Sequence, residues 1–163
     1  CNHHLSEDKV RNWLLQIITA LDHLHSHGVY YLDLNPNNIL IDEREDQIYL
    51  TYKCKLDDNE LMSTNCHYKR SIYIAPEVYS NIASINQQVD WWSLGVITYE
   101  LLTSRSLQSY YPRGISENCD LIYFPHFISP EAKDLIIEID PKLRLGRYGV
   151  EDIKTHPFFL KLE

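Results

Sequence analysis

An apolar stretch near the middle of the chain, Asp90–Leu102, constrains the fold more than any other segment. Its apolar residues leave no polar stripe, which is typical of a helix enclosed by protein on all sides. The stretch is too short to cross a bilayer, which needs roughly 20 residues. Asp90 stands just before the first tryptophan, where its carboxylate can accept from backbone N–H groups of the helix or of a neighbouring loop. We therefore expect a buried central helix, with Asp90 in a structural role.

Composition limits the class of protein. The chain has 163 residues, 44% hydrophobic and 23% charged, which suits one globular domain or half of a larger bilobal one. A net charge of -8 argues against nucleic-acid binding, which needs clustered Lys and Arg. The four cysteines are far apart and predict neither a zinc ribbon nor a disulfide framework, so a reducing, cytoplasmic location is expected. The chain opens on Cys1 rather than Met, and we expect it to be part of a longer protein.

The first clear helix follows Ser6, a capping hydroxyl followed by two acids. Apolar residues then recur at steps of three and four, and Gly28 is placed to end the helix. Three histidines, His23, His25 and His27, alternate near that end. Because residues two apart do not share a helix face, we expect solvated side chains rather than a metal site.

A short polar loop follows, bounded by apolar runs. Asp33 and Asn38 are the carboxylate and the amide that a tight loop here can aim at one point. Ile39–Ile41 and Ile48–Tyr52 then predict two short strands around a charged turn, which makes a small hairpin. Residues 53–70 have mixed polarity and no period, and predict a mobile surface segment.

The remaining chain predicts short elements around the central helix. Ala75–Glu77 begins a short helix or turn, and residues 104–118 are loop-like. Ser129 is placed to cap a helix over Ala132–Ile139, which Pro141 stops. A last short helix is expected over residues 150–155.

Five strings of residues resemble the motifs of one known family, in the family's order. They are Tyr31–Leu40, Ala75–Glu77, Asp90–Gly95, Pro141–Gly146 and His156–Phe159. They are similar to Y-R-D-L-K-P-E-N-I-L, A-P-E, D-W-W-S-L-G, P-x-x-R-L-G and H-P-F-F of eukaryotic protein kinases in the branch of protein kinases A, G and C. The resemblance implies a mainly α fold: one C-terminal kinase lobe over residues 1–163, a helical bundle around a buried central helix with a short β-hairpin. The N-terminal lobe would lie outside this chain.

The resemblance also implies roles for single residues. Asp33 matches the catalytic base, Asn38 the second metal ligand and a cofactor contact, and Leu40 the apolar floor under the adenine of ATP. Glu77 and Arg144 match an ion pair that locks the lobe. Two structural readings stay open beside these roles: a loop-ordering carboxylate paired with backbone N–H groups for Asp33, and a turn-stabilising amide for Asn38.

Several positions depart from the family pattern. The metal-binding Asp-Phe-Gly is replaced by Tyr52-Lys53-Cys54, so the principal metal carboxylate is missing. Leu32 replaces the Arg that pairs with an activation-loop phosphate, and Asn35 replaces the Lys that contacts the transferred phosphate. Lys69-Arg70 stand where a Gly-Thr pair would shape the substrate loop. These departures argue against magnesium as a cofactor.

The pattern is most similar to the degenerate kinase domain of ribosomal S-six kinase delta-like proteins. That resemblance implies protein partners and a role in endosomal signalling or trafficking, through domains outside this chain and without direct membrane contact from this segment. Three hypotheses follow: a pseudokinase scaffold, an active ATP-dependent Ser/Thr kinase with an atypical metal site, or a truncated product with no stable role. A phosphotransfer assay distinguishes the first two.

Overall fold

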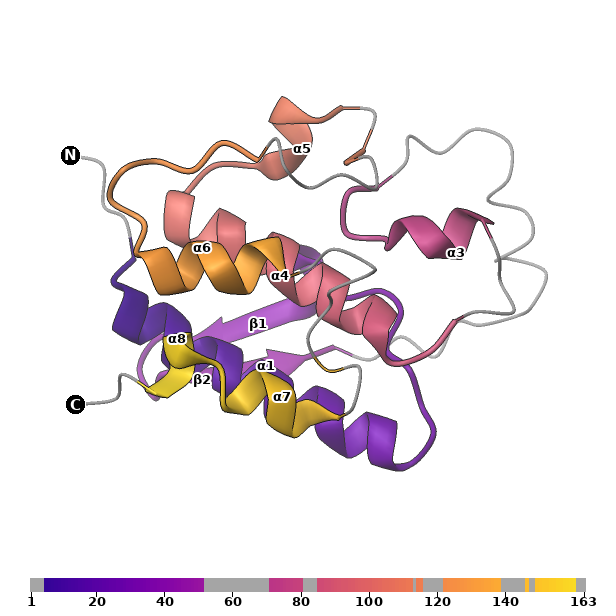
Figure 1. Ribbon diagram of the computed structural model, residues 1–163. Coiled ribbons are helices and arrows are strands. Elements are labelled where there is room, and N and C mark those ends of the chain that lie inside the picture. The colour runs from indigo at the N-terminus through magenta and orange to yellow at the C-terminus, as the bar shows by residue number, and fades with distance from the viewer. Residues whose placement is uncertain are drawn as a thin grey trace.

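The computed structural model describes residues 5–51, 71–80, 85–112, 114–115, 122–138, 146 and 149–160, with the side chains of 79–80 excepted. These residues form a mainly helical structure with one small sheet (Figure 1). In chain order the elements are α1 (Glu7–Ser26), the 3-10 helix η1 (Pro36–Asn38), β1 (Ile39–Asp42), β2 (Gln47–Leu50), α3 (Pro76–Ser80), α4 (Gln88–Thr103), α5 (Leu107–Tyr110), α6 (Pro130–Ile137), α7 (Val150–Lys154) and α8 (Pro157–Leu160).

Helix α4 is the centre of the core, as its sequence predicts. It is buried from Val89 through Tyr99, including both tryptophans. Helices α1, α5 and α6 all contact it, and Figure 1 shows them arranged around it. Removing this much apolar surface from water is the main favourable term for the fold. Within the described ranges, no helix is both long and apolar enough to span a bilayer.

Helix α1 begins and ends where its residues predict. The Ser6 side chain accepts from the backbone N–H of Lys9 at 3.3 Å, and Gly28 after the last turn has φ +73°. The repeating apolar residues form one buried face. Arg11 is also buried, and its Nε donates to the carbonyl of Phe158 at 2.5 Å. This contact joins α1 to α8, near the other end of the chain.

The predicted hairpin is confirmed. Strands β1 and β2 pair antiparallel, from Ile39 opposite Leu50 to Asp42 opposite Gln47. The hairpin is fastened to α1, because Asp46 in its turn accepts from Trp13 Nε1 at 2.7 Å. This attachment fixes the strand that follows the polar loop.

Two parts of the sequence interpretation need correction. Residues 104–118 were expected to be loop, but Leu107–Tyr110 form α5, whose Leu107 is fully buried against the core. The H-P-F-F segment forms a further short helix, α8, because both phenylalanines are buried. Helix α6 begins at Pro130 and ends at Ile137, while Ile139 and Pro141 lie outside the described residues.

Candidate functional site

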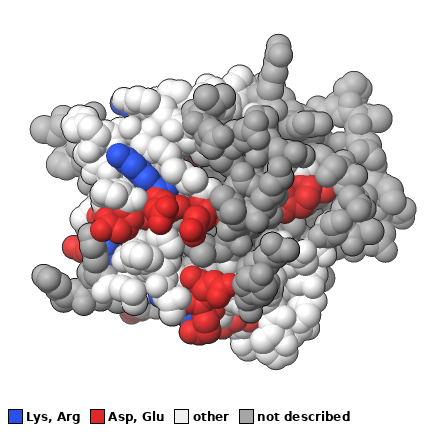
Figure 2. Space-filling view, in the orientation of Figure 1, with Lys and Arg blue, Asp and Glu red and all other residues white. Residues whose placement is uncertain are grey.

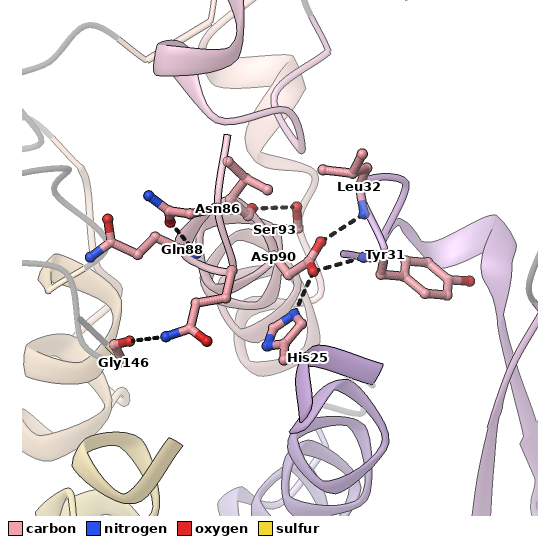
Figure 3. A network of polar contacts seen from close by, with 10 residues as sticks. His25, Tyr31, Leu32, Asn86, Gln88, Asp90, Ser93 and Gly146 are labelled. Atoms are coloured by element: carbon pink, nitrogen blue, oxygen red, sulfur yellow. Dashed lines mark hydrogen bonds and ion pairs between the residues drawn. The ribbon is translucent and has the colours of Figure 1, made fainter. Parts of the chain in front are cut away.

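Asp90 holds the polar loop in place. Its side chain is fully buried at the start of α4, and its two carboxylate oxygens accept from the backbone N–H groups of Tyr31 at 2.9 Å and Leu32 at 2.8 Å (Figure 3). Helix α4 begins at Gln88, so Asp90 lies inside the first turn and does not cap the helix. Of the two roles expected for this carboxylate, the structure therefore shows the contact with a neighbouring loop.

His25 is the third donor to Asp90, which corrects the expectation that all three histidines are solvated. Its Nε2 donates to Asp90 Oδ2 at 2.7 Å, and its side chain is only 5% exposed (Figure 3). The last turn of α1 lies against the start of α4, and the Trp91 ring packs edge-on to His25 at 5.1 Å between ring centroids. His23 and His27 are exposed, as expected. The buried acid could have signalled this partner, because a buried carboxylate requires donors.

Leu32 has a left-handed backbone, with φ +64°. A non-glycine residue in this region costs about 1–2 kcal/mol. The strained residue persists because Asp90 fixes its N–H and that of Tyr31. The loop thus turns sharply just before Asp33, at the position where the resembling family has an arginine.

The structure brings Asp33 and Asn38 together, as the sequence predicts. The amide nitrogen of Asn38 donates to the backbone carbonyl and to Oδ2 of Asp33, each at 2.8 Å. Asn38 is buried and Asp33 is exposed. The amide therefore stabilises the turn and orients the carboxylate toward solvent.

Asn35 also binds Asp33, a contact that the sequence interpretation did not predict. Its amide nitrogen donates to Asp33 Oδ1 at 2.7 Å, while its own Oδ1 accepts from the backbone N–H of Asn37 at 3.0 Å. Asn35 thereby caps η1, in which Pro36 is the first residue. Each carboxylate oxygen of Asp33 accepts from an asparagine amide rather than from a backbone N–H group. The Asn-Pro-Asn sequence is a capping signal that could have indicated this arrangement.

Thr51 connects the loop to the segment that follows the hairpin. Its backbone N–H donates to the carbonyl of Asn38 at 2.9 Å, and its carbonyl accepts from the Tyr31 hydroxyl at 2.5 Å. The next residue is Tyr52, which lies outside the described part of the chain, as do residues 53–70. In the sequence, the position at which the family carries its metal carboxylate follows Thr51 directly.

The described residues that contact Asn38 offer one carboxylate, that of Asp33, toward a magnesium site of the kind used in phosphoryl transfer. Such sites combine one or two carboxylates with phosphate oxygens. Each carboxylate oxygen of Asp33 accepts one hydrogen bond from an asparagine amide. Asn38 Oδ1 accepts from Thr51 Oγ1 at 3.4 Å, and Tyr52 is a phenol that is neutral near pH 7.

Leu40 provides an apolar surface on the hairpin. Its side chain is 54% exposed and lies opposite Tyr49, which is 52% exposed. Its expected contact with the adenine of a nucleotide stays a prediction. The predicted ion pair also stays a prediction, because Glu77 lies in α3 but Arg144 is outside the described residues, as are Lys69 and Arg70.

Helix α4 also fixes the segment that leads into α3. Trp92 Nε1 donates to the carbonyl of Ile72 at 2.8 Å, and Ser93 Oγ donates to that of Tyr73 at 2.6 Å. Asp90 holds the polar loop from the same turns of α4. One short stretch of buried helix therefore positions two loops that are far apart in the sequence.

Comparisons with known proteins agree with this geometry. The model of the protein kinase domain matches residues 1–159. Ribosomal protein S6 kinase delta-1 of Homo sapiens is 39% identical over 165 residues, covering 98% of this chain and 15% of the relative. The RAC family serine/threonine-protein kinase homolog of Dictyostelium discoideum is 38% identical, covering 97% of this chain and 37% of the relative. Ribosomal protein S6 kinase-like 1 of Pongo abelii is 35% identical, and the match covers 96% of this chain and 29% of the relative.

These relatives are much longer than the chain, which spans about 15% of the length of S6 kinase delta-1. The matches nevertheless cover almost all of the chain, and they include the loop with Asp33 and Asn38 and the buried helix α4. The mainly helical fold with one small hairpin agrees with the C-terminal lobe of a kinase. The chain therefore belongs to the protein kinase family, in the serine/threonine branch that contains protein kinases A, G and C.

Proposed function

We propose that this chain is the C-terminal lobe of a pseudokinase, a kinase-shaped domain that binds protein partners and transfers little or no phosphate. The observation that carries the proposal is the hydrogen bond from the neutral amide of Asn35 to Asp33. Asn35 and Asn38 donate to its two carboxylate oxygens, so the loop presents a carboxylate oriented by neutral groups. Catalysis of phosphoryl transfer depends on positioning and on charges that stabilise the transferred group, and Asn35 replaces the lysine with which the resembling family contacts that group.

The charges that are missing are large enough to matter. A preorganised group that stabilises transition-state charge is typically worth about 2.7–4 kcal/mol. Asn35 supplies no cation and Tyr52 no metal-binding carboxylate. Two such losses correspond to a rate deficit of roughly ten thousand-fold or more.

Restoring both charges tests the proposal. The parent, Asn35→Lys/Tyr52→Asp and a triple variant with added Asp33→Asn are compared in a protein that also carries an N-terminal kinase lobe. Magnesium-dependent transfer from radiolabelled ATP to a generic peptide is measured. We expect no transfer above background from the parent, a gain in the double variant, and its loss in the triple variant.

The second candidate function is an active Ser/Thr kinase with an atypical metal site. It is favoured by the geometry of Asp33 and Asn38, which are held together at 2.8 Å on a loop anchored by a buried acid. Magnesium-dependent turnover by the parent that Asp33→Asn abolishes would establish this function and overturn the pseudokinase proposal.

Nucleotide binding is a separate question from turnover. If ATP binds, the apolar surface at Leu40 is the contact we expect, and the affinity should be about equal with and without magnesium. Isothermal titration in magnesium and in EDTA measures this directly. A strong dependence on magnesium would show that a metal site exists despite Tyr52.

Protein partners and an endosomal role complete the proposal, on the resemblance to S6 kinase delta-like proteins. The net charge of -8 makes a nucleic-acid partner a poor fit. Imaging of the tagged full-length protein beside an endosomal marker tests the location, and diffuse signal would contradict it.

A further inference from the structure

Three side chains with metal-ligating atoms face one another where the end of α6 meets the turn between α7 and α8. They are Asp134, Glu138 and His156, and one ligand atom from each lies within 4.8 Å of the other two. His156 Nε2 is 3.5 Å from Asp134 Oδ2 and 3.9 Å from Glu138 Oε2. None of these residues belongs to the loop with Asp33 and Asn38, and His156 is the first residue of the H-P-F-F string.

Two buried polar atoms of this cluster lack hydrogen bonds. The side chain of His156 is only 4% exposed, and its Nε2 has no hydrogen-bond partner. Glu138 Oε2 is likewise buried without one. Buried polar atoms in proteins are nearly always satisfied, and an exception indicates a bound water or ion or a functional role. These two atoms are close to each other, so a water molecule or an ion bound between them would satisfy both.

The spacing suits a small divalent cation. Zinc binds imidazole nitrogen and carboxylate oxygen at about 2.0–2.2 Å, so neighbouring ligands of a tetrahedral site lie about 3.4 Å apart. Asp134 lies in the last turn of α6 and Glu138 is its C-cap, four residues later, so the two carboxylates lie on the same side of the helix end. We propose that Asp134, Glu138 and His156 bind one divalent transition-metal ion, with zinc as the best fit, and leave its fourth position open.

The surrounding charge favours a cation. On the face drawn in Figure 2, acidic side chains gather over α6 and over α7, with a basic side chain beside those of α6. Burial raises the pKa of Glu138, His156 opposes that shift, and the charge of Asp134 adds to it. A bound cation would relieve both the burial cost and the repulsion between the two carboxylates.

The other ring nitrogen gives the proposal a second readout. His156 Nδ1 accepts from the backbone N–H of Phe158 at 3.2 Å, in the first turn of α8. When Nε2 binds a metal, the neutral ring must carry its proton on Nδ1, which ends this hydrogen bond. Metal binding is therefore linked to weaker protection of one identified amide.

The test is a zinc titration of the 163-residue chain against a chromophoric chelator. Thiolates bind zinc strongly, so the parent for this series carries serine in place of all four cysteines. We expect one site, a raised melting temperature, and faster hydrogen exchange at the Phe158 amide on zinc binding. The Asp134 side chain is exposed and that of Glu138 is partly buried, so Asp134→Asn and Glu138→Gln should both leave the fold intact. Each should weaken zinc binding at least about tenfold.

Matched controls come from the other histidines. The rings of His23 and His27 are exposed and lie 4.6 Å apart between centroids, tilted by 53°. A His23→Ala/His27→Ala variant should keep full affinity. Equal affinity in Asp134→Asn, Glu138→Gln and the parent would overturn the proposal. So would a folded parent that binds no zinc, because His156 Nε2 would then face the two carboxylates without a metal between them.

Discussion

Two buried histidines, each close to carboxylates, differ in how well their polar atoms are satisfied. His25 lies 2.7 Å from Asp90, whose oxygens also accept from two backbone N–H groups. His156 lies 3.5 and 3.9 Å from its two carboxylates and makes no hydrogen bond through Nε2. The exposed fractions of the two side chains, 5% and 4%, are nearly the same.

The difference in hydrogen bonding distinguishes a site that anchors a loop, at Asp90, from a site that we propose binds a metal ion, at His156. At Asp90 every donor has found an acceptor, so the site has no capacity left and its role is to hold the loop before Asp33. At His156, Nε2 and the nearby Glu138 Oε2 are both buried without a hydrogen bond, which leaves capacity for the ion that we propose. Burial alone would not distinguish the two sites, but the hydrogen bonds do.

The largest effect should come from Asp90→Ala. Removing this carboxylate leaves His25 and two backbone N–H groups unpaired in the core, and we expect a loss of about 3–5 kcal/mol of unfolding free energy. Urea denaturation measures it. Asp22→Ala is the control, because Asp22 is half exposed and 3.6 Å from Lys154, where a pair is worth at most about 1 kcal/mol. A loss of under 1 kcal/mol at Asp90 would contradict the anchoring role.

The predicted Glu77–Arg144 pair would be a second fully satisfied anchor of similar size. A planar guanidinium matches a carboxylate, and losing either partner should cost about 3–5 kcal/mol. Denaturant melts of Glu77→Ala and Arg144→Ala should both show the loss. A change below about 0.5 kcal/mol in either variant would mean that the pair does not form.

His25→Ala should have an intermediate effect. Asp90 keeps its two backbone donors but loses a third, and a hydrogen bond to a charged group contributes about 1.5–3 kcal/mol. His23→Ala, an exposed position on the same helix, should change stability by less than about 0.5 kcal/mol. Zinc affinity should be unchanged in His25→Ala, because His25 is an anchor and not a proposed ligand. A reduced affinity would contradict the assignment of zinc binding to His156 and not to His25.

The smallest effect is expected at the C-terminal end of α4. Ser104 is exposed and left-handed, with φ +54°, so Ser104→Gly should stabilise the fold by about 0.5–1 kcal/mol. Ser106→Gly, where φ is -71°, should give no gain. Thermal melts compare the two variants. Ser104 contacts neither histidine, so Ser104→Gly should leave the zinc affinity unchanged. A changed affinity would mean that zinc binding depends on the overall stability of the fold and not on the three proposed ligands.

Much of the fold could be predicted because it depends on local patterns. The apolar period of α1, its Ser6 cap and the strand–turn–strand pattern of the hairpin all lie within short stretches. The all-round apolar character of α4 was enough to place it in the core. Helices α5 and α8 were missed because only four residues form each, too few to show a helical period.

The candidate site was predictable only in part. Asp33 and Asn38 are five residues apart, and a tight loop was enough to bring them together. The amide of Asn35 on Asp33 was missed, although it is equally local, because its replacement of a lysine was interpreted only as a lost cation.

By itself, the sequence determined which elements form, which faces they bury, and that the chain resembles a kinase lobe with altered charges. Only the tertiary structure decided that His25 is a buried donor to Asp90, 65 residues away, and that His156 meets two acids of α6. The physical reason is that the residue type determines whether a side chain can donate or accept a hydrogen bond or bind a metal. Which group it contacts depends on the packing of segments that are far apart in the sequence. Both histidines have the same chemistry in the sequence, and their different surroundings arise when α1, α4, α6 and α8 assemble.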